Sequence, residues 1–64
     1  MRKVILIFPT VVSMTEFLLL NQVSKALINT KDKELKGIVT DKVLDIACKQ
    51  FSAKIKESIS IKNF

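Results

Sequence analysis

The feature that most constrains this chain is a short apolar run, Val4–Phe8, which Pro9 ends. A continuous apolar run of this length, rich in β-branched residues and closed by a turn residue, is typical of a buried central strand. Because successive side chains of a strand point to opposite faces, both faces of this strand are apolar. A fold with helices on only one side of its sheet covers one of these faces and leaves the other exposed unless something else covers it.

A helical pattern follows this strand. Ser13–Glu16 reads Ser-Met-Thr-Glu, which matches a capping box at the start of a helix. Apolar residues then recur at helical spacing, and polar residues return at Asn21. We therefore predict a helix of about two turns that ends near Asn21.

The middle of the chain predicts a hairpin. Residues 23–30 and 34–39 have extended character, and we expect their side chains to alternate between two faces. Between them, residues 30–33 are polar and include an aspartate, which is typical of a turn. Gly37 lies inside the second of these strands and indicates a bulge or a close contact with another segment.

A second helix is predicted from residue 41. Thr40 can cap its first turn, and Asp41 is favourable there because the amino end of a helix carries partial positive charge. An amphipathic stripe follows, formed by Val43, Leu44, Ala47, Cys48 and Phe51.

From Ala53 the hydrophobic period changes to two, with apolar residues at most odd positions and lysine or serine at every even position through Lys62. This alternation predicts a half-exposed strand over 53–62. The alternative is that the second helix continues to about Ile59. The strand is preferred because Ser52 interrupts the helical pattern and isoleucines follow it.

The expected order is strand, helix, strand, strand, helix, strand in a single domain, residues 1–64. This order predicts an α+β, ferredoxin-like two-layer sandwich, in which two helices cover one face of a four-stranded antiparallel sheet. The pattern of a strand ending in FP, a capped helix, a lysine-containing hairpin and then TDKVLDIACKQF resembles short uncharacterised bacterial proteins of ferredoxin-like type. This resemblance implies the fold and carries no functional motif.

The length and composition of the chain argue against several classes of function. A chain of 64 residues cannot enclose a deep active site, and its 48% hydrophobic content is high for so small a monomer. The chain contains no histidine, so it lacks the commonest acid–base group and metal ligand. We therefore expect no enzymatic activity, no catalytic residues, no cofactor and no metal. The single cysteine, Cys48, argues against disulfides and points to a reducing compartment, the cytoplasm.

Individual reactive residues have structural interpretations. Cys48 has no histidine partner and lies on the apolar stripe of the second helix, so we expect a buried structural thiol. Glu16 is interpreted as part of the capping box. Asp41 and Asp45 lie one turn apart, but lysines alternate with them, which favours a solvated helix face over a cation site. Residues 4–20 are apolar but interrupted by Pro9 and polar side chains, so we expect no membrane span.

Two surfaces are candidates for binding. Eleven Lys and Arg against six Asp and Glu give a net charge of +5. Lys54, Lys56 and Lys62 are predicted to share one face of the last strand and are candidate phosphate contacts, which supports a basic nucleic-acid-binding domain. Their alternative role is to protect an edge strand from aggregation.

The second surface is the apolar first strand. If helices cover one of its faces, the other is exposed, and Ile5 and Ile7 are the candidate self-association residues. The leading hypothesis is therefore a non-enzymatic interaction module that forms a homodimer by packing sheet against sheet. The alternative for this face is a monomer with a modest exposed apolar patch. A small-ligand regulatory module is the third alternative.

Overall fold

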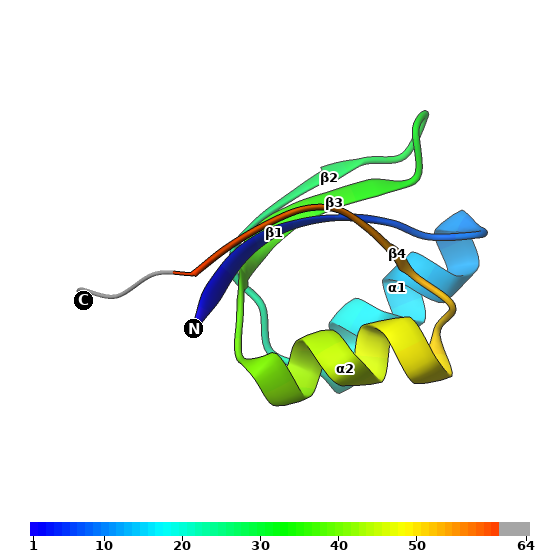
Figure 1. Ribbon diagram of the computed structural model, residues 1–64. Helices are drawn as coiled ribbons and strands as arrows, with labels where there is room; N and C mark the ends of the chain where they lie inside the picture. The colour runs from blue at the N-terminus through cyan, green and yellow to red at the C-terminus, as the bar shows by residue number, and fades with distance from the viewer. Residues whose placement is uncertain (61–64) are drawn as a thin grey trace.

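The structure is a computed structural model that describes residues 1–60, and both helices lie on one side of a single sheet (Figure 1). The four strands are antiparallel and lie in the order β2-β3-β1-β4. This confirms the ferredoxin-like α+β fold and shows that the last segment is a strand. The elements are β1 (Arg2–Ile7), α1 (Val11–Leu20), β2 (Ser24–Asn29), β3 (Glu34–Val39), α2 (Asp41–Gln50) and β4 (Lys54–Ser60).

The central strand β1 pairs with β3 on one side and β4 on the other. Val4, Leu6 and Phe8 are at most 1% exposed, so this set of side chains faces the helices. Ile5 and Ile7, which alternate with them, therefore face away from the helices. The doubly apolar strand has one covered face and one face without helices.

The start of α1 differs from the prediction. The helix begins at Val11, with Thr10 as its N-cap, and the Thr10 hydroxyl oxygen accepts a 3.0 Å hydrogen bond from the Ser13 amide. The predicted capping box at Ser13–Glu16 is therefore wrong, because a residue nearer to Pro9 supplies the same kind of oxygen one turn earlier. The earlier start frees the Ser13 hydroxyl, which donates to the Phe51 carbonyl at 3.2 Å and ties α1 to the end of α2.

The second helix matches its prediction. Thr40 is the N-cap of α2 and accepts a 3.2 Å hydrogen bond from the Val43 amide. At the other end, Ser52 has a left-handed φ of 55°, and the amides of Phe51 and Ala53 both donate to the Ala47 carbonyl. These bonds close the helix and turn the chain into β4.

The core lies between the sheet and the two helices. Three phenylalanine rings from three segments meet there: Phe17 of α1 lies 5.4 Å from Phe8 and 5.4 Å from Phe51 between ring centroids. Such tilted and edge-on pairs add to the apolar burial. The buried residues are Val4, Leu6, Phe8, Met14, Phe17, Leu35, Val39, Leu44, Ala47 and Ala53.

The edge strand β2 does not alternate regularly, contrary to the prediction for residues 23–30. Its register against β3 shifts between Ser24 and Leu27, and Lys25 in this interval has a φ of 53°. Gly37 of β3 lies opposite this irregularity, and a Cβ atom at Gly37 would overlap the side chain of Val23. The glycine therefore allows the close approach that its place in the strand indicated.

The last strand contains a bulge that the predicted alternation over 53–62 does not include. Leu6 pairs with Ile55, whereas its neighbour Ile5 pairs with Glu57, so Lys56 is an extra residue in β4. Beyond the bulge the faces of the strand exchange. Ser58 falls opposite the buried Val4, on the helix-covered face, although it was predicted to lie beside the lysines.

Candidate interaction surface on the open sheet face

The face of the sheet opposite the helices, here called the open face, has an ordered arrangement of side chains. Directly paired residues of antiparallel strands share a face, so the register defines which side chains lie beside Ile5 and Ile7. Three rows cross β3, β1 and β4 in that order: Glu34–Ile7–Lys54, Lys36–Ile5–Glu57 and Ile38–Lys3–Ile59. Apolar and charged side chains therefore alternate across the face.

The apolar members of the open face are partly accessible to solvent. Ile7 is 36% exposed and Ile59 is 50% exposed, while Ile5 and Ile38 are half-buried. Leu27 of β2, which pairs with Lys36, extends the face to the sheet edge and is 67% exposed. In a sheet covered on both sides these positions would lie in the hydrophobic core. The open face is therefore an apolar sheet face that no part of residues 1–60 covers.

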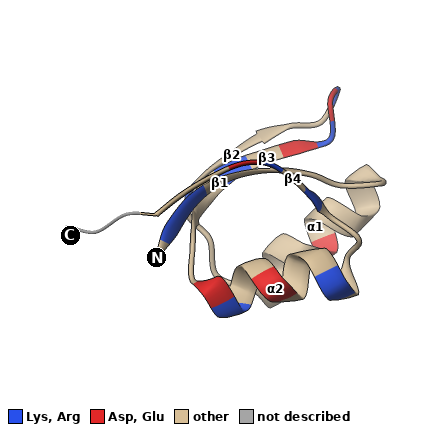
Figure 2. Ribbon diagram, in the orientation of Figure 1, with Lys and Arg blue, Asp and Glu red and all other residues tan. Residues whose placement is uncertain are grey.

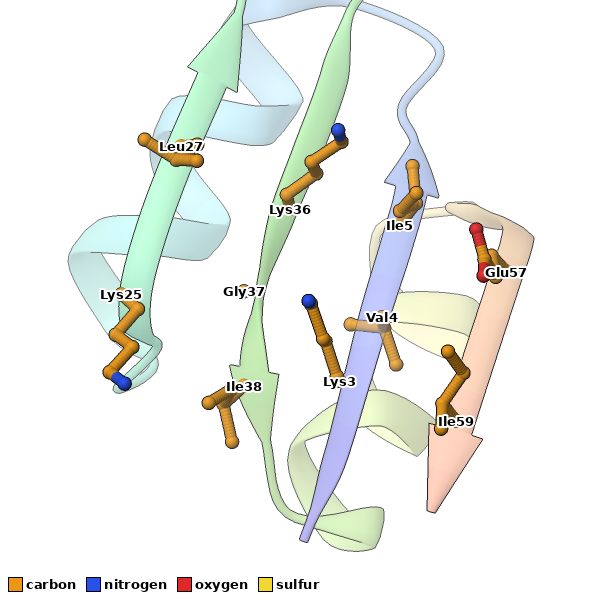
Figure 3. Close-up of a pocket in the computed structure, with 10 residues that line it drawn as sticks. All are labelled: Lys3, Val4, Ile5, Lys25, Leu27, Lys36, Gly37, Ile38, Glu57 and Ile59. Atoms are coloured by element: carbon orange, nitrogen blue, oxygen red, sulfur yellow. The ribbon is translucent and has the colours of Figure 1, made fainter. Parts of the chain in front are cut away.

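A shallow hollow of about 480 Å³ lies over the middle of the open face. Figure 3 views the sheet with the helices behind it and shows the side chains around this hollow. Ile5 stands between Lys36 and Glu57, and Lys3 stands between Ile38 and Ile59. Leu27 and Lys25 of β2 complete the lining, so the hollow combines apolar side chains with charged ones.

The register places more lysines than carboxylates on the open face, and Figure 2 marks the Lys and Arg positions along the strands in blue. The Lys56 ammonium nitrogen lies 3.4 Å from a carboxylate oxygen of Glu34, so these two residues form an ion pair within the chain. Lys25 lies where the backbone is strained, at its left-handed φ, and lines the hollow. The lysines of the face are Lys3, Lys25, Lys36, Lys54 and Lys56, and its carboxylates are Glu34 and Glu57.

Lys36 and Glu57 are oppositely charged residues of one row, and Ile5 lies between them. Their strands lie on either side of β1, which places the two backbones about 10 Å apart. Neither of them makes a salt bridge with any of residues 1–60. Each therefore presents an unmatched charge to whatever approaches the open face.

The structure brings together four of the residues singled out from the sequence. Ile5, Ile7 and Lys54 lie on the open face by register, and Lys56 reaches the same face through its ion pair with Glu34. Two of the three lysines predicted as phosphate contacts thus lie on the same surface as the two isoleucines predicted for self-association. Lys62 lies outside the described residues.

The other singled-out residues lie elsewhere. Asp41 pairs with Arg2 at 2.7 Å and Asp45 with Lys49 at 3.3 Å, so each carboxylate of α2 has its own cation. Cys48 is half-buried, not fully buried as expected, because it borders an opening between α2 and β4. Glu16 is exposed on α1.

A second group of exposed apolar residues lies on the outer side of α1. Leu19 is 80% exposed and Leu20 is 75% exposed, and Glu16 is the one charged residue in this helix. Neither leucine lines the hollow on the open face.

Several members of the open face were not identified from the sequence. Lys36 and Ile38 follow from the alternation of β3 once Leu35 and Val39 are known to be core. Glu57 and Ile59 do not follow from any local pattern, because the bulge at Lys56 decides their face.

Within residues 1–60, no group of His, Cys, Asp and Glu side chains is arranged to hold a metal ion. None of the helices in this range has the length and apolar character needed to cross a membrane. No protein-family model, curated protein or solved structure matches the chain.

Proposed function

We propose that the chain is a small, non-enzymatic interaction module that forms a homodimer through the open face. The observation that carries this proposal is the apolar content of that face: Ile5, Ile7 and Ile38 belong to central strands, and no part of residues 1–60 forms a layer above them. Packing two sheets face to face, about 10 Å apart, would supply the missing layer. The dimer would have four layers, with the helices outside.

The size of the face sets the expected affinity. Four strands of six or seven residues, spaced by about 4.8 Å and rising about 3.3 Å per residue, cover roughly 400 Å² in projection. Two corrugated faces of this size bury on the order of 1,000 Å², which is near the lower limit for a specific interface. We therefore expect a dimer that dissociates in the micromolar range.

The Ile7→Lys variant tests whether the open face forms the dimer interface. Complete burial of an isoleucine side chain contributes roughly 1.5–3 kcal/mol, so burying the exposed third of Ile7 contributes about 0.5–1 kcal/mol per copy. Both copies lose this contribution in the variant, and the lysine adds charge repulsion. The loss of burial alone should raise the dissociation constant about 5- to 30-fold, measured by sedimentation velocity over a dilution series.

Leu19→Lys is the matched control. It introduces the same side chain at a more exposed apolar position on α1, behind the sheet, and should leave the dissociation constant unchanged. A wild-type monomer at all concentrations would overturn the proposal. The proposal is equally wrong if Leu19→Lys separates the copies and Ile7→Lys does not.

A basic nucleic-acid-binding domain is the second candidate, and the lysines lining the hollow favour it. Lys3, Lys25 and Lys36 come from three neighbouring strands and could contact successive phosphates of a single strand. Fluorescence anisotropy with labelled single-stranded DNA and RNA tests this candidate. Binding at low salt that Lys25→Gln and Lys36→Gln weaken would support it, and no binding at low salt would exclude it.

A further inference from the structure

The register of the sheet contains information about how two copies would meet, and the following inference rests on the proposed homodimer. We propose that the two-fold axis of the dimer lies between the sheets and runs parallel to β1, so that β1 faces β1 of the partner copy and β3 faces the partner's β4. The argument depends on which charges each arrangement brings together.

With the axis parallel to β1, each row meets the same row of the second copy in reverse order. Lys36 then faces Glu57 of the second copy, and Glu57 faces its Lys36. The unmatched charges of each copy thus find opposite charges in the other. In the neighbouring rows, Glu34 faces Lys54, and Ile38 faces Ile59, so a second ionic contact and an apolar contact also form twice.

Along the axis itself, equivalent residues meet. Ile5 faces Ile5 and Ile7 faces Ile7, which forms a continuous apolar centre. Lys3 faces Lys3 and is the like-charged contact of this arrangement. It lies next to the first residue of β1, so its long aliphatic stem can carry the ammonium group out to solvent at the end of the sheet.

A two-fold axis that crosses the strands at Ile5 gives the opposite result. It maps the middle row onto itself strand by strand, so that Lys36 faces Lys36 and Glu57 faces Glu57. Like charges opposed in a closing interface oppose association and specify against that geometry. An axis that crosses the strands at Leu6 places Glu34 opposite Lys36 and Lys54 opposite Glu57, and exchanging the charges of Lys36 and Glu57 would make both of these contacts repulsive. The axis parallel to β1 is the arrangement in which that exchange preserves the attractive contacts between Lys36 and Glu57.

A charge-reversal cycle tests this geometry by sedimentation velocity. Lys36→Glu and Glu57→Lys each replace two attractive contacts by two repulsive ones, and each should raise the dissociation constant about tenfold. The double variant restores both contacts in exchanged form and should return the constant to within about threefold of the wild type. Lys42→Glu and Glu16→Lys, on the outer sides of the helices, make the same changes in net charge and should have no effect.

The outcomes separate this inference from the proposed function. If Ile7→Lys dissociates the dimer but the double variant is no tighter than the two single variants, the axis is wrong and the open-face dimer stands. If the single variants have no effect, the axis is also wrong. If the wild-type chain is monomeric at all concentrations, or if Lys42→Glu weakens the dimer as much as Lys36→Glu does, both proposals fail.

Discussion

The Gly37→Ala variant tests whether the close approach of β2 to β3 requires a residue without a side chain at position 37. The new Cβ atom would overlap Cγ1 of Val23 and lie 3.3 Å from the Ser24 carbonyl oxygen, so the edge strand must move. Inserting a methyl group into such a contact costs about 1–3 kcal/mol. Removing a glycine from a strand recovers about 0.5–1 kcal/mol of backbone entropy. The free energy of unfolding should therefore fall by about 1–2 kcal/mol.

Urea denaturation followed by circular dichroism, at one protein concentration, measures this change. With an m-value of about 1 kcal/mol per molar urea for so small a domain, the midpoint should fall by about 1–2 M. Val23→Ala removes the overlapping atom and is the control. In the double variant the loss should be smaller than the sum of the single losses by about 1 kcal/mol. A Gly37→Ala variant as stable as the wild type, or strictly additive losses, would refute this reasoning.

The helix ends provide two further predictions, both measured by thermal and urea denaturation. Thr10→Ala should lower the free energy of unfolding by about 1 kcal/mol because it removes the N-cap of α1, whereas Glu16→Gln should change it by less than about 0.5 kcal/mol. The reverse order of effects would favour a capping box at Ser13. Ser52→Gly should raise the free energy by about 0.5–1 kcal/mol because glycine adopts the left-handed φ without a steric penalty. A loss of stability in this variant would contradict that assignment.

The order and type of the elements were predictable because each segment has a strong local pattern. The apolar run at Val4–Phe8, the stripe of α2 and the strand of residues 34–39 each require only periodicity and a terminating residue to be recognised. The start of α1 was missed because the local sequence offers two possible caps. Thr10 and Ser13 both carry a hydroxyl group, and the Ser13 hydroxyl instead donates to the Phe51 carbonyl, 38 residues away, which no local pattern predicts.

Half of the open face was predictable and half was not. The isoleucines of β1 follow from alternation, since the adjacent strand positions fill the core. The positions of Glu57 and Ile59 depend on a bulge at Lys56, and a bulge adds a residue without changing the composition of the segment. The residues that lie beside Lys36 on the open face could not be predicted, because they depend on the pairing register of the strands. The proposed dimer geometry depends on that register.

The most direct test of the open-face dimer is an isotope-filtered nuclear Overhauser experiment on a mixed sample at millimolar concentration. Half of the chains are uniformly labelled with carbon-13 and nitrogen-15, and the other half are unlabelled, so cross-peaks between labelled and unlabelled protons arise only between copies. The account predicts intermolecular cross-peaks at Ile5, Ile7, Ile38 and Ile59. Cross-peaks to the side chains of Leu19 and Leu20 instead, or none in a sample in which most chains are dimeric, would contradict it.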